Sequence, residues 1–382
     1  MSNQPAVLGP DGVARPYIGG QALLEGVMMR SPHAFSAVVR RRDGSLVVRE
    51  RPMVDLRKGA RAWPIVRGMM ALVEALKLGS QALRFSAEIY ERDLEESEQA
   101  EAAKAKTAGS TLLSALALPI VHLMTAEPEL AAGKPSDEPK GKGWMGLVSV
   151  AFAIGLFVAL PQAFAAGASS LFKLNLDVRS PLFQLLTASA KLTILVGYML
   201  LIRRLPEIYR VFQYHGAEHK SIYTYESGAE LTVENARSRT TLHPRCGTTF
   251  IVMVALVSIA VFSGLGPFLP QLGLGKLADN LLFFVLKLPF LPLIAAITFE
   301  LQRLLAKYCS TGPLSVLLWP GFLVQKITTI EPDDQQLEVA LSALLVTLRV
   351  EKGEAAVREA DASFPSYAAL QQVPTPLQDA LA

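Results

Sequence analysis

Alternating apolar and polar positions near the start of the chain predict a β-hairpin. The two alternating segments are residues 35–41 and 46–51, and a period of two places successive side chains on opposite faces of a strand. Between them, Asp43 and Gly44 supply the positive φ that a tight turn requires. We therefore expect a small β-containing N-terminal domain over residues 1–63.

A helical period replaces the alternation after Pro64. Apolar residues such as Ile65 and Met69 recur at intervals of three and four, which predicts an amphipathic helix over 64–92. This helix carries too many charges to cross a membrane. Residues 93–142 then form a polar linker. Within it, the uncharged stretch 107–126 predicts either an additional apolar helix or a fifth membrane span.

Four later segments are apolar over lengths that match a hydrocarbon layer of about 30 Å. We predict one transmembrane helix in each of residues 143–172, 180–202, 246–275 and 280–299. Lys191 and Lys287 lie near the middle of their spans, where a charge costs about 3 kcal/mol on insertion scales. Each lysine is expected either to face the bundle interior, with Glu300 as a partner of opposite sign, or to mark a shifted span boundary.

The last third of the chain has weaker patterns. Residues 308–325 are uncharged, but Gly-Pro and Pro-Gly pairs at 312–313 and 320–321 interrupt them, so 303–330 are expected to be interfacial or re-entrant. An apolar stripe predicts a C-terminal amphipathic helix over 331–363. The predicted units are therefore 1–63, 64–92, 93–142, 143–202, 203–248, 249–302, 303–330, 331–363 and a tail at 364–382.

Composition turns this pattern into a fold class. The chain is 51% hydrophobic and 19% charged, with a mean hydropathy of +0.32, which is typical of a mainly α, polytopic membrane protein with the lipid bilayer as partner. A net charge of +3 does not favour nucleic-acid binding. Seven Lys and Arg lie in 203–245, against two in 173–179 and one in 276–279. The positive-inside rule therefore places 203–245, and with four spans both terminal domains, in the cytoplasm.

The connection 203–248 contains the candidate chemistry. Residues 214–220 read YHGAEHK, so on a helix His215 and His219 share a face with Glu218 nearly in line. In the H-x-x-E-H arrangement, two histidines bind zinc and the glutamate activates water. His243 or Cys246, in a turn set by the proline between them, would supply a further ligand. We expect a divalent metal, with zinc the best match to these ligands.

The number of ligands separates two functions. Three protein ligands leave a position for water or substrate, which would make the protein a hydrolase with Glu218 as general base. Four ligands would make the site structural, in a non-enzymatic assembly factor or adaptor for another membrane protein complex. Without a metal, the histidines would pair with carboxylates such as Glu226 or Glu230, and Cys246 would cap a helix. A transporter is less favoured because no internal repeat is visible.

Further motifs accompany the histidine segment, at residues 19–30, 214–220, 231–237, 243–248 and 325–332. Together they resemble the YqhQ-like family of bacterial membrane proteins, described as predicted metal-dependent enzymes. The resemblance implies an inner-membrane protein whose motif positions are Glu25, His215, Glu218, His219, His243 and Cys246. It also implies that the first motif joins the site, with Glu25 as a ligand or a partner of a histidine, Arg30 as an anion-binding residue, and Gly19, Gly20 and Gln21 nearby.

Overall fold

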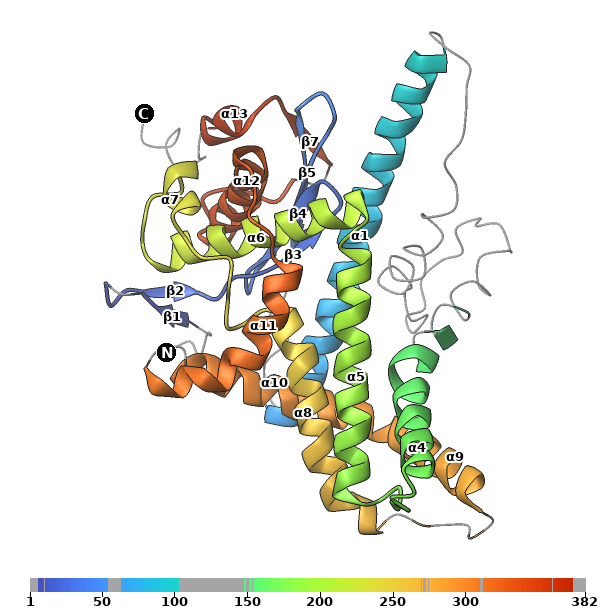
Figure 1. Ribbon diagram of the computed structural model, residues 1–382. Helices are drawn as coiled ribbons and strands as arrows, with labels where there is room; N and C mark the ends of the chain where they lie inside the picture. The colour runs from blue at the N-terminus through green and yellow to red at the C-terminus, as the bar shows by residue number, and fades with distance from the viewer. Residues whose placement is uncertain are drawn as a thin grey trace, which may run out of the picture.

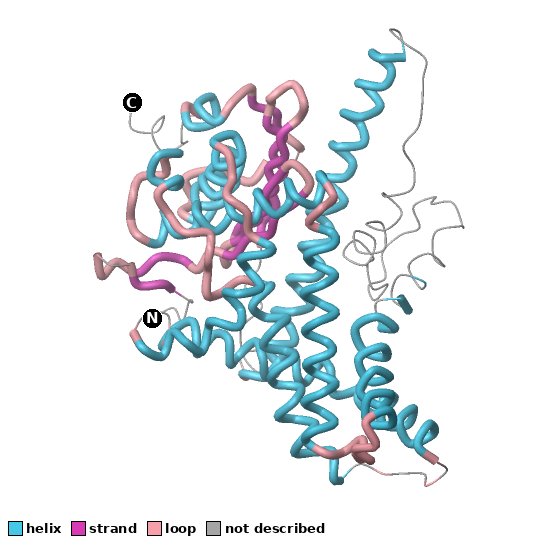
Figure 2. The backbone as a smooth tube through the Cα atoms, viewed as in Figure 1, coloured by secondary structure: helices cyan, strands magenta, loops and turns pink. Residues whose placement is uncertain are grey.

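A small sheet domain lies at one end of a bundle of apolar helices (Figure 1). The computed structural model describes residues 6–9, 11–53, 63–102, 148, 151–152, 154–268, 270, 273, 275–309, 312–358 and 360–373. The predicted apolar segment 107–126 and most of the linker around it lie outside the described residues. Some helices surround the strands of the sheet domain, and the others extend away from it as the bundle (Figure 2).

The sheet contains five antiparallel strands in the order β3-β4-β5-β6-β7. They are β3 (Gly19–Leu23), β4 (Gly26–Arg30), β5 (Ala34–Arg40), β6 (Leu46–Pro52) and β7 (Ala362–Phe364). The predicted hairpin is confirmed as β5–β6, with Gly44 at φ +89° in its turn. Two further short strands, β1 (Ala6–Leu8) and β2 (Ala14–Pro16), pair separately. Strands β3 and β4 were not expected from the sequence, because glycines interrupt the alternation there.

Helices cover both faces of the sheet. On one face, Leu23, Phe35 and neighbouring residues pack against Phe85 of α1 (Pro64–Ala102). On the other, Val38 and its neighbours share a core with α6 (Pro206–Glu226) and with Leu341 of α12 (Asp334–Glu351). The N-terminal strands, the central motif helix and the C-terminal helix therefore form one three-layered domain.

Local signals explain where the helices of this domain begin. Asp333 and Gln336 form a capping box at the start of α12. Thr232 caps α7 (Val233–Arg237) by accepting a hydrogen bond from the amide of Asn235. A last short helix, α13 (Tyr367–Gln371), packs on α12 through Leu370. Helix α1 continues as far as Ala102, beyond the predicted end at residue 92.

Three helical segments in the described part of the chain are long and apolar enough to cross a membrane. They are α5 (Pro181–Ile202), α8 (Gly247–Leu265) and the segment Leu281–Tyr308, which combines parts of α9 (Lys276–Lys287), η4 (Leu288–Phe290) and α10 (Leu291–Tyr308). The sequence predicts a fourth span at 143–172. Only Gly155–Leu171 of it is described as a continuous apolar helix, made of η2 (Gly155–Ala159) and α4 (Leu160–Leu171). At the far end of α8 lies η3 (Gly266–Phe268).

The charges inside the bundle have partners other than the predicted ones. Glu300 pairs with Arg67 of α1, at 2.6 Å between Nη2 and Oε2, so the predicted lysine–glutamate pairing is wrong. Lys287 is buried and donates to Oε1 of Gln184 at 3.1 Å, and its ammonium group lies over the ring of Phe283. Lys191 is partly buried on α5. The polar atoms of Gln184 and the aromatic face satisfy Lys287 without a carboxylate.

The interrupted segment before α12 folds as two short helices, η5 (Pro313–Leu318) and α11 (Trp319–Thr328). Gly321 brings α11 against α8, because a side chain at this position would overlap Thr249. The end of α11 therefore lies beside the beginning of α8. This contact positions the site described next.

Candidate metal centre

Helix α6 presents the H-x-x-E-H residues on one face, as the spacing predicts. Pro206 starts the helix immediately after α5, and α6 then runs between the sheet and the bundle (Figure 1). The rings of His215 and His219 lie 4.5 Å apart between centroids. Gly216 lets α6 approach the chain beyond α11, because a side chain there would overlap the carbonyl of Ile330. The face with the histidines is thus fixed against two neighbouring segments.

Both histidines are oriented through their Nδ1 atoms. Nδ1 of His215 lies 2.9 Å from the carbonyl oxygen of Thr328, at the end of α11. Nδ1 of His219 makes a short contact with the carbonyl oxygen of Thr241. A carbonyl accepts only, so each Nδ1 carries the proton and each Nε2 has a free lone pair. This is the tautomer in which a histidine binds a metal through Nε2.

The thiol of Cys246 meets these free nitrogens. Its Sγ lies 3.1 Å from Nε2 of His215, and one ligand atom from each of His215, His219 and Cys246 falls within 4.8 Å of the others. Cys246 also caps α8, where its sulfur accepts from the amide of Thr248. Burial alone raises the pKa of the thiol, but the adjacent His219 and Thr248 outweigh burial, so the net shift is downward.

His243 lies next to this group without joining it. Its ring centroid is 5.4 Å from that of His219. The side chain of Gln325 holds the backbone of His243 at both its amide and its carbonyl, at 2.8 and 2.7 Å. Nδ1 faces the amide of Arg245 at 3.4 Å, and Nε2 faces Oε2 of Glu226 at 3.7 Å. Burial lowers the pKa of His243 to about 4, which keeps the ring neutral.

Glu218 lies on the same face of α6, and only 6% of its surface is exposed. It packs on Gly20 of β3, where an added Cβ would be 2.7 Å from the Cγ atom of Glu218. No described residue donates a hydrogen bond to its carboxyl group. Burial raises the pKa of Glu218 to about 8, and Cys246 adds to the rise while His215 opposes it. The carboxyl group can therefore exchange a proton near neutral pH.

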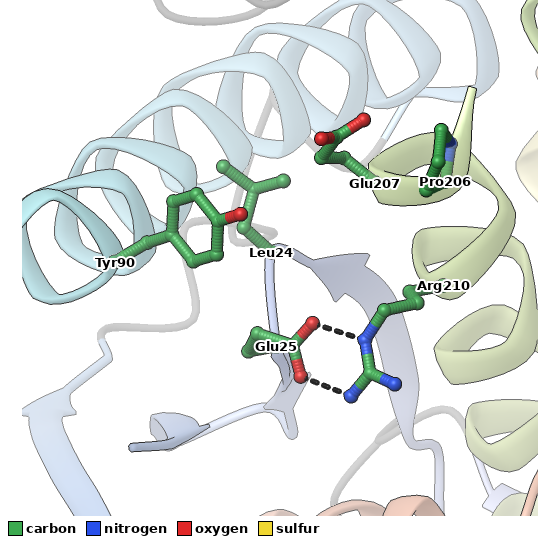
Figure 3. Close-up of a pocket in the computed structure, with 6 residues that line it drawn as sticks. All are labelled: Leu24, Glu25, Tyr90, Pro206, Glu207 and Arg210. Atoms are coloured by element: carbon green, nitrogen blue, oxygen red, sulfur yellow. Dashed lines mark hydrogen bonds and ion pairs between the residues drawn. The ribbon is translucent and has the colours of Figure 1, made fainter. Parts of the chain in front are cut away.

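Only Gly20 of the N-terminal motif reaches this group of residues. Glu25, in the β3–β4 turn at φ 50°, forms a two-point ion pair with Arg210, with Nη2 to Oε2 at 2.5 Å. It also accepts from the hydroxyl of Tyr214 at 3.2 Å. Figure 3 shows this pair in a shallow hollow, whose other lining residues are Leu24, Tyr90, Pro206 and Glu207. Glu25 therefore anchors α6.

Arg30 and Gln21 of the motif contact α1. Arg30 pairs with Glu74 at 3.1 Å, and the amide of Gln21 packs on Gly79. Gly19 lies beside the stem of Arg30. Because β3 alternates, Gly20 faces α6 while Gly19 and Gln21 face the opposite side of the sheet. The hairpin thus connects α1 to the helix that bears the histidines.

Several residues of the site could not be predicted from the sequence. The carbonyl groups of Thr241 and Thr328 hold the histidines, and a backbone acceptor leaves no trace in the type of side chain. Gln325 also joins His243 to Thr249, whose hydroxyl accepts from Nε2 at 2.6 Å. Two signals point to Gln325, namely its place at the start of the motif 325–332 and its uncharged polar side chain in an apolar segment, but neither gives its partners.

Comparison with known proteins identifies the family of the chain. Residues 63–350 match the model of a family described as "Protein of unknown function (DUF1385)". The chain belongs to this family. It is also 32% identical over 348 residues to "Uncharacterized protein YqhQ" of Bacillus subtilis (strain 168), covering 88% of this chain and 93% of that protein. The expected YqhQ-like relationship is therefore confirmed. No solved structure matches the chain.

Neither description names a reaction, so any activity of this family member has to be inferred from the residues of its site. The matched region 63–350 contains α6, His243, Cys246 and α11. The relative covers most of the chain. The site therefore lies within the part of the chain that defines the family.

Proposed function

We propose that this protein is a membrane-integrated, metal-dependent hydrolase that holds zinc through His215, His219 and Cys246. The main support is the orientation of the two imidazoles, because each has Nδ1 on a backbone carbonyl, which leaves the lone pair of Nε2 available to a metal. Two nitrogens and one sulfur are ligands that zinc accepts, and three protein ligands are typical of catalytic sites. His243 stays outside the group, which favours an open fourth position.

A bound zinc ion would supply Lewis acidity, polarising a carbonyl or phosphoryl group and activating water. Glu218 would take up and return the proton, because its carboxyl group is buried beside His215 and Cys246. Thr328 and Thr241 would hold the imidazoles in one tautomer throughout. The helices packed around the site would keep bulk water away from the reacting group.

A second candidate is an assembly factor with a structural metal site. One observation favours it: the three ligands join α6 to the start of α8, and the carbonyls that orient them belong to α11 and to the connection before α8. An ion bound there would clamp four segments together. His243 is near enough to become the fourth ligand if its ring turned toward the group.

The orientation of the protein in the membrane is part of this proposal. The sheet, α6 and α12 share one core, so the chain must cross the membrane an even number of times between them. Along the chain, α5 comes after the strands β3 to β6 and before α6, so it would be one crossing. The helical segment Gly155–Leu171 would be the second crossing. Helix α8 and Leu281–Tyr308 form the next pair. Four spans, with the metal centre in the cytoplasm, satisfy this parity and the positive-inside rule.

Metal content tests the ligand set. Protein purified without chelators should contain one zinc ion per chain. The variants His215→Ala, His219→Ala and Cys246→Ala should each lose the ion, whereas His243→Ala and Glu218→Gln should retain it. Elemental analysis of each purified variant provides the measurement. Absence of any transition metal from the unsubstituted protein would refute both candidates.

Cobalt substitution separates the two candidates without knowledge of a substrate. Co²⁺ in the site should show a thiolate absorption band that Cys246→Ala abolishes. Addition of a hydroxamate should change the visible spectrum if the fourth position is open. If the visible spectrum of the Co²⁺ protein does not change on addition of hydroxamate, but differs between the unsubstituted protein and His243→Ala, the site is closed and structural.

A further inference from the structure

The outward face of α1 changes character at Lys77. Before it, the large exposed residues of the helix, together with Trp63 just ahead of it, are all apolar and between 40% and 70% accessible, namely Trp63, Ile65, Val66, Met69, Val73 and Leu76. After it, the exposed positions are charged, among them Arg84, Glu88, Glu91 and Arg92. A helix in water carries polar residues on its outer face along its whole length. The first half of α1 therefore has the outer face of a helix in lipid.

Charged side chains in this first half turn inward. Arg67 forms a two-point pair with Glu300 of α10, at 3.0 and 2.6 Å. Glu74 pairs with Arg30 of the sheet at 3.1 Å. Both helix charges are mostly covered, with 23% and 28% of their side chains exposed. Polar residues inside and apolar residues outside are the arrangement expected where the surroundings are apolar.

The apolar face continues the surface of a membrane helix. Gly68 brings α1 into contact with α10, since a Cβ there would lie 2.9 Å from the carbonyl oxygen of Ala296. Helix α10 belongs to the candidate span Leu281–Tyr308 and exposes Leu304. In Figure 1 the beginning of α1 lies among the helices of the bundle, and its later turns reach the sheet. The exposed faces of the two helices therefore share one environment.

We infer that residues 63–76 are embedded in the lipid bilayer, with the outward face of this half-helix against acyl chains. The thirteen helical residues 64–76 extend about 20 Å, less than the hydrocarbon thickness of about 30 Å. Strand β6 before this segment and the second half of α1 after it pack in the same sheet domain. The segment therefore enters and leaves on one side of the membrane, and the crossing number stays even.

A half-helix in lipid gives the N-terminal motif a role at the membrane surface. Arg30 of β4 and Gln21 of β3 contact α1 where it leaves the lipid, and Gly20, next to Gln21 on β3, contacts Glu218. The hairpin is thus the direct connection between the lipid-facing helix and the carboxyl group of the site. This connection does not depend on whether a metal binds.

Depth-dependent quenching tests the placement. The protein is reconstituted into phosphatidylcholine vesicles after single substitution and labelling with a polarity-sensitive fluorophore at Val73→Cys, Met69→Cys or, as a control on the same helix, Glu91→Cys. Cys246 and Cys309 are both buried, so the unsubstituted protein measures background labelling. Lipids brominated on their acyl chains should quench the fluorophore at residues 69 and 73 several-fold more than at 91, and aqueous iodide should show the opposite order.

Two outcomes would overturn the inference. Equal quenching by iodide at all three positions would place the half-helix in water. Protection from both quenchers at residues 69 and 73, together with disulfide cross-linking between copies, would show that a second chain covers this face. Since none of the three labelled positions contacts the metal centre, failure here would leave the metal experiments unaffected.

Discussion

At the scale of single residues, the site depends on backbone groups that orient the side chains of the candidate ligands and of Glu218. Thr328 and Thr241 orient the imidazoles through their carbonyl groups. Gly20 has no side chain, and this leaves the space that the side chain of Glu218 occupies. Sequence spacing was sufficient for His215, Glu218 and His219, because a helix converts spacing into a shared face. It was insufficient to rank Cys246 and His243, whose positions depend on how α8 and α11 meet.

Gly20→Ala should disturb Glu218 directly. The added methyl group would lie 2.7 to 2.8 Å from three atoms of that side chain, and such overpacking typically costs about 1–3 kcal/mol. Gly19→Ala is the control, since its nearest neighbour would be 3.4 Å away, and a change within about 0.5 kcal/mol is expected. Chemical denaturation in detergent measures both.

A double-mutant cycle makes the attribution specific. In a Glu218→Ala background the methyl group at residue 20 meets no carboxyl group, so Gly20→Ala should become nearly neutral. Both single variants should keep their metal. An unchanged cost of Gly20→Ala in that background would show that the methyl group strains the sheet and not the site.

Acid should displace the metal only below the usual range for histidine. Burial lowers the pKa of His219, and the net pKa shift of the Cys246 thiol is also downward. Both shifts favour the unprotonated forms that bind a metal, so binding should persist as pH falls through about 6.5, the ordinary histidine value. Zinc retained after equilibration at stepped pH gives the midpoint. Half-release at or above pH 6.5 would contradict this expectation.

At the scale of elements, short polar contacts align helices that composition alone cannot place. The spans of α5 and α8 follow from apolar length, and the β5–β6 hairpin follows from alternation and its glycine turn. The pairing of Glu300 with Arg67 could not be predicted, because it requires α1 and α10 to be neighbours. Two of the charges that argued against a membrane location for α1, Arg67 and Glu74, are paired inside the protein.

Gly321→Ala should loosen α11 from α8. The new methyl group would lie 2.7 Å from the hydroxyl oxygen of Thr249 and closer still to its methyl group. Because α11 carries Gln325 and Thr328, displacement should lower both the unfolding temperature and the affinity for zinc. Gly264→Ala on α8 meets nothing within 4 Å and should leave zinc affinity unchanged. Equal zinc affinities in the two variants would show that the position of α11 does not affect zinc binding.

At the scale of the whole molecule, segments from the beginning, middle and end of the chain build one domain at one end of the helix bundle. The distribution of basic residues predicts these three pieces on one face, and the common core of β4, α6 and α12 brings them together. The strand added by the C-terminal segment, β7, had no counterpart in the prediction, since three residues are too few to show a period.

Opposite ends of the bundle should be labelled from opposite sides. Ser45 lies in the hairpin turn of the sheet domain, and Phe268, 83% exposed, lies at the far end of α8. In sealed vesicles of known orientation, an impermeant maleimide should reach Ser45→Cys only from the cytoplasmic side and Phe268→Cys only from the other. Labelling of both from one side would refute the four-span arrangement.

The position of β7 also has a consequence for the order of synthesis. Strand β6 pairs with β5 on one side and with Ala362–Phe364 on the other, yet more than 300 residues separate these partners along the chain. A ribosome finishes the apolar helices before it produces β7. The edge of β6 that pairs with β7 therefore stays unpaired while these helices are synthesised. The sheet can therefore be completed only after every helix between β6 and β7 has been synthesised. A chain that stalls earlier exposes an unpaired strand edge, which chaperones and quality-control proteases can recognise.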